Sequence, residues 1–386
     1  MILKSSKKSI KWKIPLYKVH VNKTDLDYVS SVIKRGMNWA LGPEIISLEK
    51  KLARYVGSKH CVCFNSGTSA GHAVMIAMNL EKSQVLVPSF SFIATANWPL
   101  MVGAHPKFVD IEEETLGMDP NKIEQKISQK VKAIMPIHFA GLPCKINEIS
   151  SIAKKNKIKL IEDCAESIGS SINNKKTGTF GDASILSFAG NKILTAGEGG
   201  AVLTNSDKLF EKLKLIRSHG RLTKENYFLS NKNPKYTSLG YNWRMSTITA
   251  ALALSQLENL KFLIKKRQEN VEYMKKNLKN IEQIKFHSSP KGFVHVNQLF
   301  SIILSNSKIR NNLMTFLADK GIMSKIFFTP IHKSEHFKKL DVSTSNLTIT
   351  EKISNTILSL PLYPDLTRSE MNYITNSVTE FFELCE

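Results

Sequence analysis

The chain has few of the features that mark secreted, membrane or metal-binding proteins. Its 386 residues include only five cysteines, an odd number with no C-x-x-C spacing. This pattern indicates free thiols in a reducing compartment and argues against a zinc site. No apolar run approaches the ~20 residues that a membrane-spanning helix needs. The first residues are basic, but no apolar segment follows them as in a secretory signal, so we expect a protein of the cytoplasm.

Acidic residues are also scarce, since 33 Asp and Glu face 54 Lys and Arg and leave a net charge of +21. Such a balance attracts anions, including nucleic acids, membrane surfaces and the diphosphate of a nucleotide sugar. The lysines are scattered in pairs, such as 154–155, 275–276 and 338–339, which is typical of solvated helix faces. With 8% aromatic residues and no zinc-finger or RNP-like motif, nucleic-acid binding has little support and stays only as an alternative.

The apolar segments alternate between two kinds. Strand-like runs cover residues 84–88, 106–109, 131–137, 158–161, 184–188 and 201–203, and helical stretches cover residues 70–80, 120–128, 146–155 and 209–217. This alternation predicts an α/β fold with a mostly parallel sheet covered by helices on both faces.

A second region follows this alternation. Residues 246–278 are helical and charged, and lead to a strand at 299–304, a helix at 309–320 and a terminal helix at 368–385. The length and the 42% hydrophobic content suffice for one large and one smaller domain. We expect a large domain at 1–255 and a small C-terminal α+β domain at 256–386.

Lys192 is the first candidate for chemistry. It follows residues 183–188, an apolar run that predicts a buried strand, where an ammonium can be desolvated and become nucleophilic. Pyridoxal phosphate needs a primary amine to hold its aldehyde as a Schiff base, and lysine alone supplies one. The alternative is an ordinary solvated lysine.

Asp163 is the second candidate, at the end of the predicted strand Leu160-Ile161-Glu162-Asp163. Ligands of open α/β sheets bind outside the carboxyl ends of the strands. Because consecutive strand side chains alternate faces, only one of the two acids can face a given cofactor. We assign Asp163 to the protonated ring nitrogen of pyridoxal phosphate and a structural role to Glu162. The alternative is two acids that simply begin a loop.

A third element is the turn Asn65-Ser66-Gly67-Thr68-Ser69, which runs into a helix-like stretch. Backbone amides at a helix N-terminus form an anion site, and the Thr68 and Ser69 hydroxyls add donors, so a phosphate suits this turn. An ordinary helix cap without a ligand is the alternative.

Together these motifs resemble the sugar aminotransferases of the DegT/DnrJ/EryC1/StrS family. The segments that carry the resemblance lie in the same order at 39–44, 66–68, 87–95, 108–111, 161–166, 178–182, 187–200, 217–221, 240–245 and 358–364. The resemblance implies a fold-type I pyridoxal phosphate enzyme. Its large domain would hold a mostly parallel, seven-stranded type of sheet between helices, with a smaller C-terminal α+β domain.

The resemblance also implies roles around the cofactor ring. Lys192 matches the lysine that holds the cofactor and moves the proton between the cofactor and the sugar C4. Asp163 matches the partner of the ring nitrogen, and Phe92 matches the aromatic residue stacked on the ring. Glu166 stands where many relatives carry a glutamine that bonds the 3-hydroxyl.

The phosphate contacts follow in the same way. Gly67, Thr68 and Ser187 match the phosphate cradle, and Asn242 matches an asparagine that reaches the phosphate from a neighbouring subunit. The resemblance therefore implies a homodimer with shared active sites.

The substrate side of the site is implied by two residues, Arg221 and His332, which match positions that touch the nucleotide sugar. The motifs are most similar to those of the perosamine synthase branch, which acts on GDP-4-keto-6-deoxymannose. Ala189 departs from that branch, where an aromatic residue is usual, and so do residues 139–143. The smaller side chains leave room for a dTDP-linked 4-keto-6-deoxyglucose and a viosamine product.

The reaction type follows from Lys192, because relatives that remove a hydroxyl carry histidine at this position. The resemblance thus implies transamination, with L-glutamate as donor and a 4-amino-4,6-dideoxy sugar nucleotide for glycan biosynthesis as product. A catalytically idle relative that senses nucleotide sugars, and a pyridoxal phosphate enzyme of amino acids alone, are the remaining alternatives.

Overall fold

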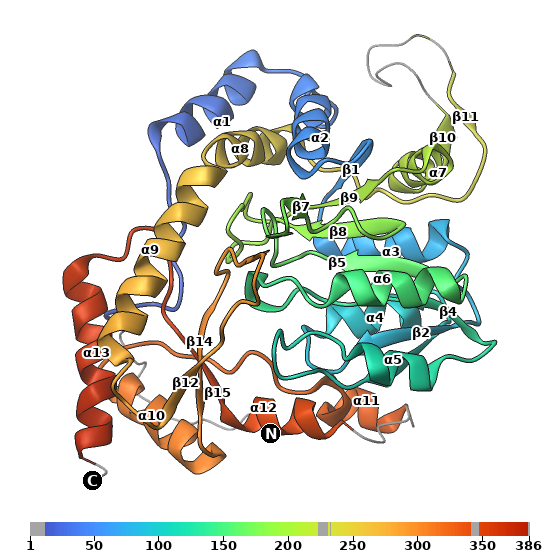
Figure 1. Ribbon diagram of the computed structural model, residues 1–386. Helices are drawn as coiled ribbons and strands as arrows, with labels where there is room; N and C mark the ends of the chain where they lie inside the picture. The colour runs from blue at the N-terminus through green and yellow to red at the C-terminus, as the bar shows by residue number, and fades with distance from the viewer. Residues whose placement is uncertain (1–11, 223–230, 232, 341–346, 385–386) are drawn as a thin grey trace, which may run out of the picture.

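The computed structural model describes residues 12–222, 231, 233–340 and 347–384 (Figure 1). Two helices, α1 (Lys23–Arg35) and α2 (Pro43–Val56), come before the first strand and pack against α8 (Thr247–Glu258). A capping box formed by Asn22 and Asp25 begins α1. The sequence patterns considered above had not predicted this N-terminal pair.

A seven-stranded sheet forms the centre of the large region, in the order β1-β9-β8-β5-β4-β2-β3. The strands are β1 (His60–Phe64), β2 (Gln84–Pro88), β3 (His105–Val109), β4 (Val131–Ile134), β5 (Lys159–Asp163), β8 (Ala183–Ser187) and β9 (Gly200–Thr204). Within this sheet β9 pairs antiparallel with both neighbours, and the other pairings are parallel. The predicted mostly parallel sheet is confirmed.

Helices cover both faces of this sheet, as predicted (Figure 1). One face packs against α3 (Gly67–Ala77), α4 (Ala94–Met101) and α7 (Asp207–Arg217), and the other against α2, α5 (Pro120–Lys126), α6 (Ile146–Lys155) and α8. Strand β1 shows the alternation, because Val62 and Phe64 enter one core while Cys61 and Cys63 enter the other. Burial of both faces explains why the strands read as continuous apolar runs.

The C-terminal region has its own core. The long helix α9 (Leu260–Leu278) leads to a three-stranded sheet of β12 (Ile284–Phe286), β14 (Phe300–Leu304) and β15 (Ile357–Leu360), which packs against α10 (Ser307–Asp319) and α13 (Arg368–Glu383). Ile14 pairs with Ile322 and packs in this core, so the N-terminal segment reaches the C-terminal region. The boundary at residue 255 stays a prediction.

The remaining elements are short. They are α11 (Glu335–Lys339), α12 (Thr348–Thr356), β6 (Ser171–Ile172), β7 (Lys175–Lys176), β10 (Arg221–Leu222), β11 (Lys235–Tyr236) and β13 (Phe293–Val294), with single helical turns at Phe139–Gly141 and Ile331–Lys333. Strand β13 pairs with β6 and so joins the C-terminal region to the large one.

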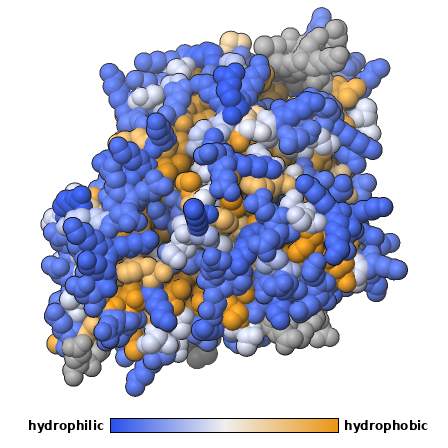
Figure 2. Space-filling model, viewed as in Figure 1, coloured by the Kyte–Doolittle hydropathy of each residue, from blue (hydrophilic) through white to orange (hydrophobic). Residues whose placement is uncertain are grey.

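Among the described residues, none of the helices combines the length and the apolar character that crossing a membrane requires. On the face shown in Figure 2, hydrophilic residues dominate and hydrophobic ones lie in separate patches between them.

Candidate active site

A cavity of about 510 Å³ opens at the carboxyl ends of β5 and β8. Seven of the residues singled out from the sequence line it, from separate parts of the chain: Gly67, Thr68, Phe92, Asp163, Glu166, Ser187 and Lys192. This location agrees with the rule that ligands of α/β sheets bind beyond the carboxyl ends of the strands.

Asp163 is a buried carboxylate in the wall of this cavity, 7% exposed. Its Oδ2 accepts a hydrogen bond from the Thr95 hydroxyl at 2.8 Å, and its Oδ1 accepts one from the Ala165 amide at 3.1 Å. Burial raises the pKa of Asp163 above its usual value, and these two hydrogen bonds oppose the rise only in part. A cation in the cavity would stabilise this charge.

Lys192 lies on the turn that follows β8, where its amide donates to the Ala189 carbonyl at 3.0 Å. Its Nζ is 3.3 Å from Glu166 Oε1, and both side chains are largely buried. The other oxygen of Glu166 accepts from the Ala140 amide at 2.9 Å. The amine thus stands in the cavity, paired with one carboxylate.

The N-terminus of α3 forms another wall. Ser66 caps the helix by accepting from the Ser69 amide at 3.1 Å. A Cβ on Gly67 would come within 3.2 Å of the Ser187 Cβ, so glycine allows the helix end and the end of β8 to approach closely. Free amides at a helix start, with the Thr68 and Ser187 hydroxyls nearby, make a cradle for an anion.

Phe92 lies at the open side of the cavity, with 62% of its surface exposed. Tyr17, 46% exposed, lines the same cavity from the N-terminal segment. Large aromatic surfaces of this kind at a cavity mouth are suited to contact a ligand or another chain.

Three predicted site residues do not line this cavity. Asn242 is exposed and pairs with Ser218. Arg221 and Arg244 both donate to the Ser218 hydroxyl, at 3.3 and 3.2 Å. His332 is 7% exposed, and its ring bonds Ser89 at 2.7 Å and Glu351 at 3.2 Å. The roles of Asn242, Arg221 and His332 stay predictions.

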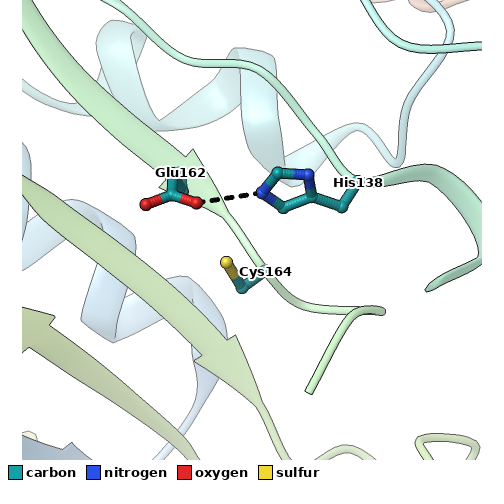
Figure 3. A group of neighbouring side chains, drawn as sticks. All are labelled: His138, Glu162 and Cys164. Carbon is teal, nitrogen blue, oxygen red and sulfur yellow. Dashed lines mark hydrogen bonds and ion pairs between the residues drawn. The ribbon is translucent and has the colours of Figure 1, made fainter. Parts of the chain in front are cut away.

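Glu162 points to the other face of β5, into a cluster with His138 and Cys164 (Figure 3). The carboxylate accepts four hydrogen bonds of 2.7–3.1 Å, from the amides of Gly178, Phe180 and Gly181 and from His138 Nε2. His138 Nδ1 accepts from the Cys144 amide at 3.1 Å, so Nε2 carries the ring hydrogen.

These contacts leave the cluster poorly suited to a metal ion, although its ligand atoms lie within 4.8 Å of one another. Both imidazole nitrogens are engaged, and Glu162 is saturated by donors. Burial, and then the charge of Glu162, raise the pKa of the Cys164 thiol well above its usual value, which keeps it protonated. To bind zinc, this cluster would need an imidazole nitrogen with a free lone pair, and Cys164 would have to become a thiolate to serve as a ligand.

Several residues near the cavity had not been singled out for a role. Thr95 donates to Asp163 and belongs to the segment 87–95, which carries part of the family resemblance. The sequence therefore marked the segment, but it did not indicate that Thr95 would contact Asp163. Lys325, Phe327 and Phe328 line the cavity from the C-terminal region, and no local pattern marks them. Tertiary contacts of this kind leave no periodic signal.

The sequence similarity to known proteins covers nearly the whole chain. Residues 20–379 match the DegT/DnrJ/EryC1/StrS aminotransferase family. The chain is 33% identical to GDP-perosamine synthase of Escherichia coli O157:H7 over 374 residues, 96% of this chain and 98% of that protein. It is 32% identical to GDP-perosamine synthase of Vibrio cholerae over 372 residues, 96% and 99% of the two chains.

The fold shows the same relationship. The solved structure of Helicobacter pylori PseC, an aminotransferase involved in the biosynthesis of pseudoaminic acid, matches with a TM-score of 0.88 at 29% identity, over 98% of this chain and 100% of that one. This likeness confirms the fold class that the sequence resemblance implies. The chain belongs to the DegT/DnrJ/EryC1/StrS aminotransferase family.

Proposed function

We propose that the protein is a pyridoxal phosphate-dependent aminotransferase of a nucleotide-linked 4-keto-6-deoxyhexose, with L-glutamate as the amino donor. The observation that carries this proposal is the meeting of Lys192, Asp163 and the α3 N-terminus around one cavity, although they lie far apart in the sequence. Similarity to two GDP-perosamine synthases favours a GDP-linked substrate, and a dTDP-linked one is the second option.

The residues present fit pyridoxal phosphate. Asp163 is a buried carboxylate whose pKa is raised by burial, and a protonated ring nitrogen is the type of partner that would relieve it. The α3 N-terminus, with Thr68 and Ser187, fits the phosphate. Phe92 offers an aromatic face at the cavity mouth. When bound, the cofactor would supply an electron sink for carbanion chemistry at the amino carbon.

Each side chain then has a task. Lys192 Nζ would hold the cofactor aldehyde and, when free, would move the proton between the cofactor and the sugar C4. Glu166 fixes the position of that amine through the contact at 3.3 Å. Phe92, which lines the cavity, would shield the bound cofactor from water. The partly buried site strengthens each of these electrostatic contacts.

The substrate and a second subunit would complete the open side. Asn242 is exposed and outside the cavity of its own chain, which suits a residue that serves a neighbouring site. Exposed apolar side chains also lie on and between α1 and α2, with Leu26 at 63%, Ile46 at 57% and Trp39 at 48% exposed. We propose a homodimer with shared active sites, acting in the cytoplasm on a sugar nucleotide for glycan biosynthesis.

A spectrum tests the function. The purified protein is mixed with pyridoxal phosphate, then with L-glutamate, and then with GDP-, dTDP- and UDP-linked 4-keto-6-deoxyhexoses in turn. We expect the visible band of the lysine-bound cofactor to disappear with glutamate and to return with one of the sugars. That sugar also identifies the nucleotide.

Lys192→Ala is the matched control. It removes the amine, so no lysine-bound band should form, and turnover should fall by roughly 10³-fold or more. A wild-type band that ignores every keto sugar would contradict the sugar substrate while leaving the cofactor in place.

A further inference from the structure

Gln298 joins the C-terminal region to the turn that carries Lys192. It lies in the irregular segment between β13 and β14, is 3% exposed, and is not among the residues that line the cavity. Its Oε1 accepts from the Ile193 amide at 3.0 Å, and its Nε2 donates to the Asn191 carbonyl at 2.8 Å. One side chain therefore bonds the backbone on both sides of Lys192.

These two partners fix the amide in one orientation. A flipped amide would set its oxygen against the Asn191 carbonyl and its NH₂ against the Ile193 amide. Because the side chain is buried, water could not easily replace either bond. The turn thus depends on an amide side chain at this position.

The backbone of Gln298 reaches the other half of the Lys192–Glu166 pair. Its amide donates to the Ala140 carbonyl at 2.8 Å, and the Ala140 amide donates to Glu166 Oε2 at 2.9 Å. Ala140 has a φ of 55°, a left-handed conformation that an alanine adopts only when its surroundings hold it there. The amine and its carboxylate partner are therefore both held through Gln298.

We infer that Gln298 is a positioning residue, which sets the Lys192 amine for attack on the cofactor aldehyde without touching the cofactor. The inference rests on the cofactor proposed above. In the step concerned, the Nζ of Lys192 adds to the aldehyde carbon and water leaves, so that a carbon–nitrogen double bond replaces the carbon–oxygen one. A misplaced amine slows this addition even when the cofactor sits correctly.

The test separates covalent capture from simple binding. Cofactor-free protein is mixed rapidly with pyridoxal phosphate, and the rate of the visible band is followed. Pyridoxamine phosphate, which has no aldehyde, is titrated separately for its Kd. For Gln298→Met, which keeps the length but loses both bonds, we expect capture to slow by about tenfold or more while this Kd changes by less than about threefold.

Two further variants complete the design. Gln298→Glu keeps the acceptor for the Ile193 amide but sets an oxygen against the Asn191 carbonyl, so its capture should also be about tenfold or more slower than wild type. It serves as the test if Gln298→Met does not fold. Gln256→Met is the matched control, because Gln256 is 1% exposed and makes two side-chain bonds, to the His20 carbonyl and Asp25, away from Lys192. Its capture rate should equal that of wild type.

The outcomes are distinct. Capture by Gln298→Met at the wild-type rate, or equal slowing by Gln256→Met, would overturn the positioning role and leave the proposed function intact. A wild-type protein that binds pyridoxamine phosphate but never captures pyridoxal phosphate would overturn the proposed function, and this inference with it.

Discussion

The two faces of the sheet at the end of β5 hold neighbouring carboxylates in opposite situations. On one face, Glu162 is fully buried and accepts four hydrogen bonds. On the other, Asp163 is 7% exposed at the cavity and accepts two. Both acids lie on β5 and are similarly buried, so they differ mainly in the number of hydrogen bonds that they accept.

This contrast separates an acid that holds the fold together from one that awaits a ligand. Four donors satisfy the oxygens of Glu162, and the loop at 178–181 is fixed by them. The two donors to Asp163 do not offset its burial, which raises the pKa of that carboxyl. A buried ionisable group left short of partners beside a cavity is a mark of a functional site.

Replacing Asp163 by Asn should give the largest change in activity. The variant keeps shape and loses the charge opposite the proposed ring nitrogen, so we expect kcat/KM to fall by roughly 100-fold or more. Turnover of glutamate with the keto sugar measures this. Activity within a few-fold of wild type would remove Asp163 from the proposed role.

Asp163→Asn should lower the activity but raise the stability of the cofactor-free protein. A folded-state pKa raised above the unfolded value means that the ionised Asp163 costs stability, and the cost is fully present above the folded pKa. Cofactor-free Asp163→Asn should therefore have a higher Tm than wild type at pH 8. The gap should shrink as the pH falls through the raised pKa, because wild-type Asp163 then becomes neutral.

Glu162→Gln tests the other face and should act on stability. The NH₂ group of the glutamine would replace one carboxylate oxygen and so face a group that donates to it now, either His138 Nε2 or a loop amide. Two hydrogen-bond donors would then oppose each other in a buried place without an acceptor. We expect the free energy of unfolding to fall by about 2–4 kcal/mol, measured by urea unfolding. The activity of the folded fraction should change far less than in Asp163→Asn, and the reverse order would break the comparison.

Glu166→Gln should have a smaller effect than either. Glutamine keeps an acceptor for the Ala140 amide but loses the charge beside Lys192. Because a glutamine oxygen can still accept a hydrogen bond from the Lys192 amine, we expect kcat/KM to stay within about tenfold of wild type. The Tm of the cofactor-free protein should fall slightly, because the partly buried ion pair is lost. A loss as large as that of Asp163→Asn would give Glu166 a direct role in proton transfer.

Much of the frame could be predicted from the sequence because it is local. The apolar runs predicted β2 at 84–88 and α6 at 146–155 with their observed bounds. Alternation along β5 also predicted that only one of Glu162 and Asp163 would face a cofactor, and the structure sets Asp163 in the cavity wall.

The contacts that complete the site could not be predicted because they are distant in sequence. His138 lies 24 residues from Glu162, and Gln298 lies 105 residues from Ile193. A buried glutamine or histidine carries no periodic signal that identifies its partner. The predicted substrate residues Arg221 and His332 contact other parts of the chain, and neither of them lines the cavity.

Metal addition should have the smallest effect. The side chains of the His138–Glu162–Cys164 cluster are of types that bind metal ions. Both imidazole nitrogens already make hydrogen bonds, however, and the Glu162 carboxylate already accepts four. Binding a zinc ion would break several of these bonds and require a thiol with a raised pKa to ionise. Neither equimolar Zn²⁺ nor a chelator should shift the Tm by more than about 1 °C, because a ligand that binds the native state appreciably would raise it. Stoichiometric zinc retained through gel filtration, and lost in His138→Gln, would instead place a metal on the face of β5 that the hydrogen bonds assign to structure.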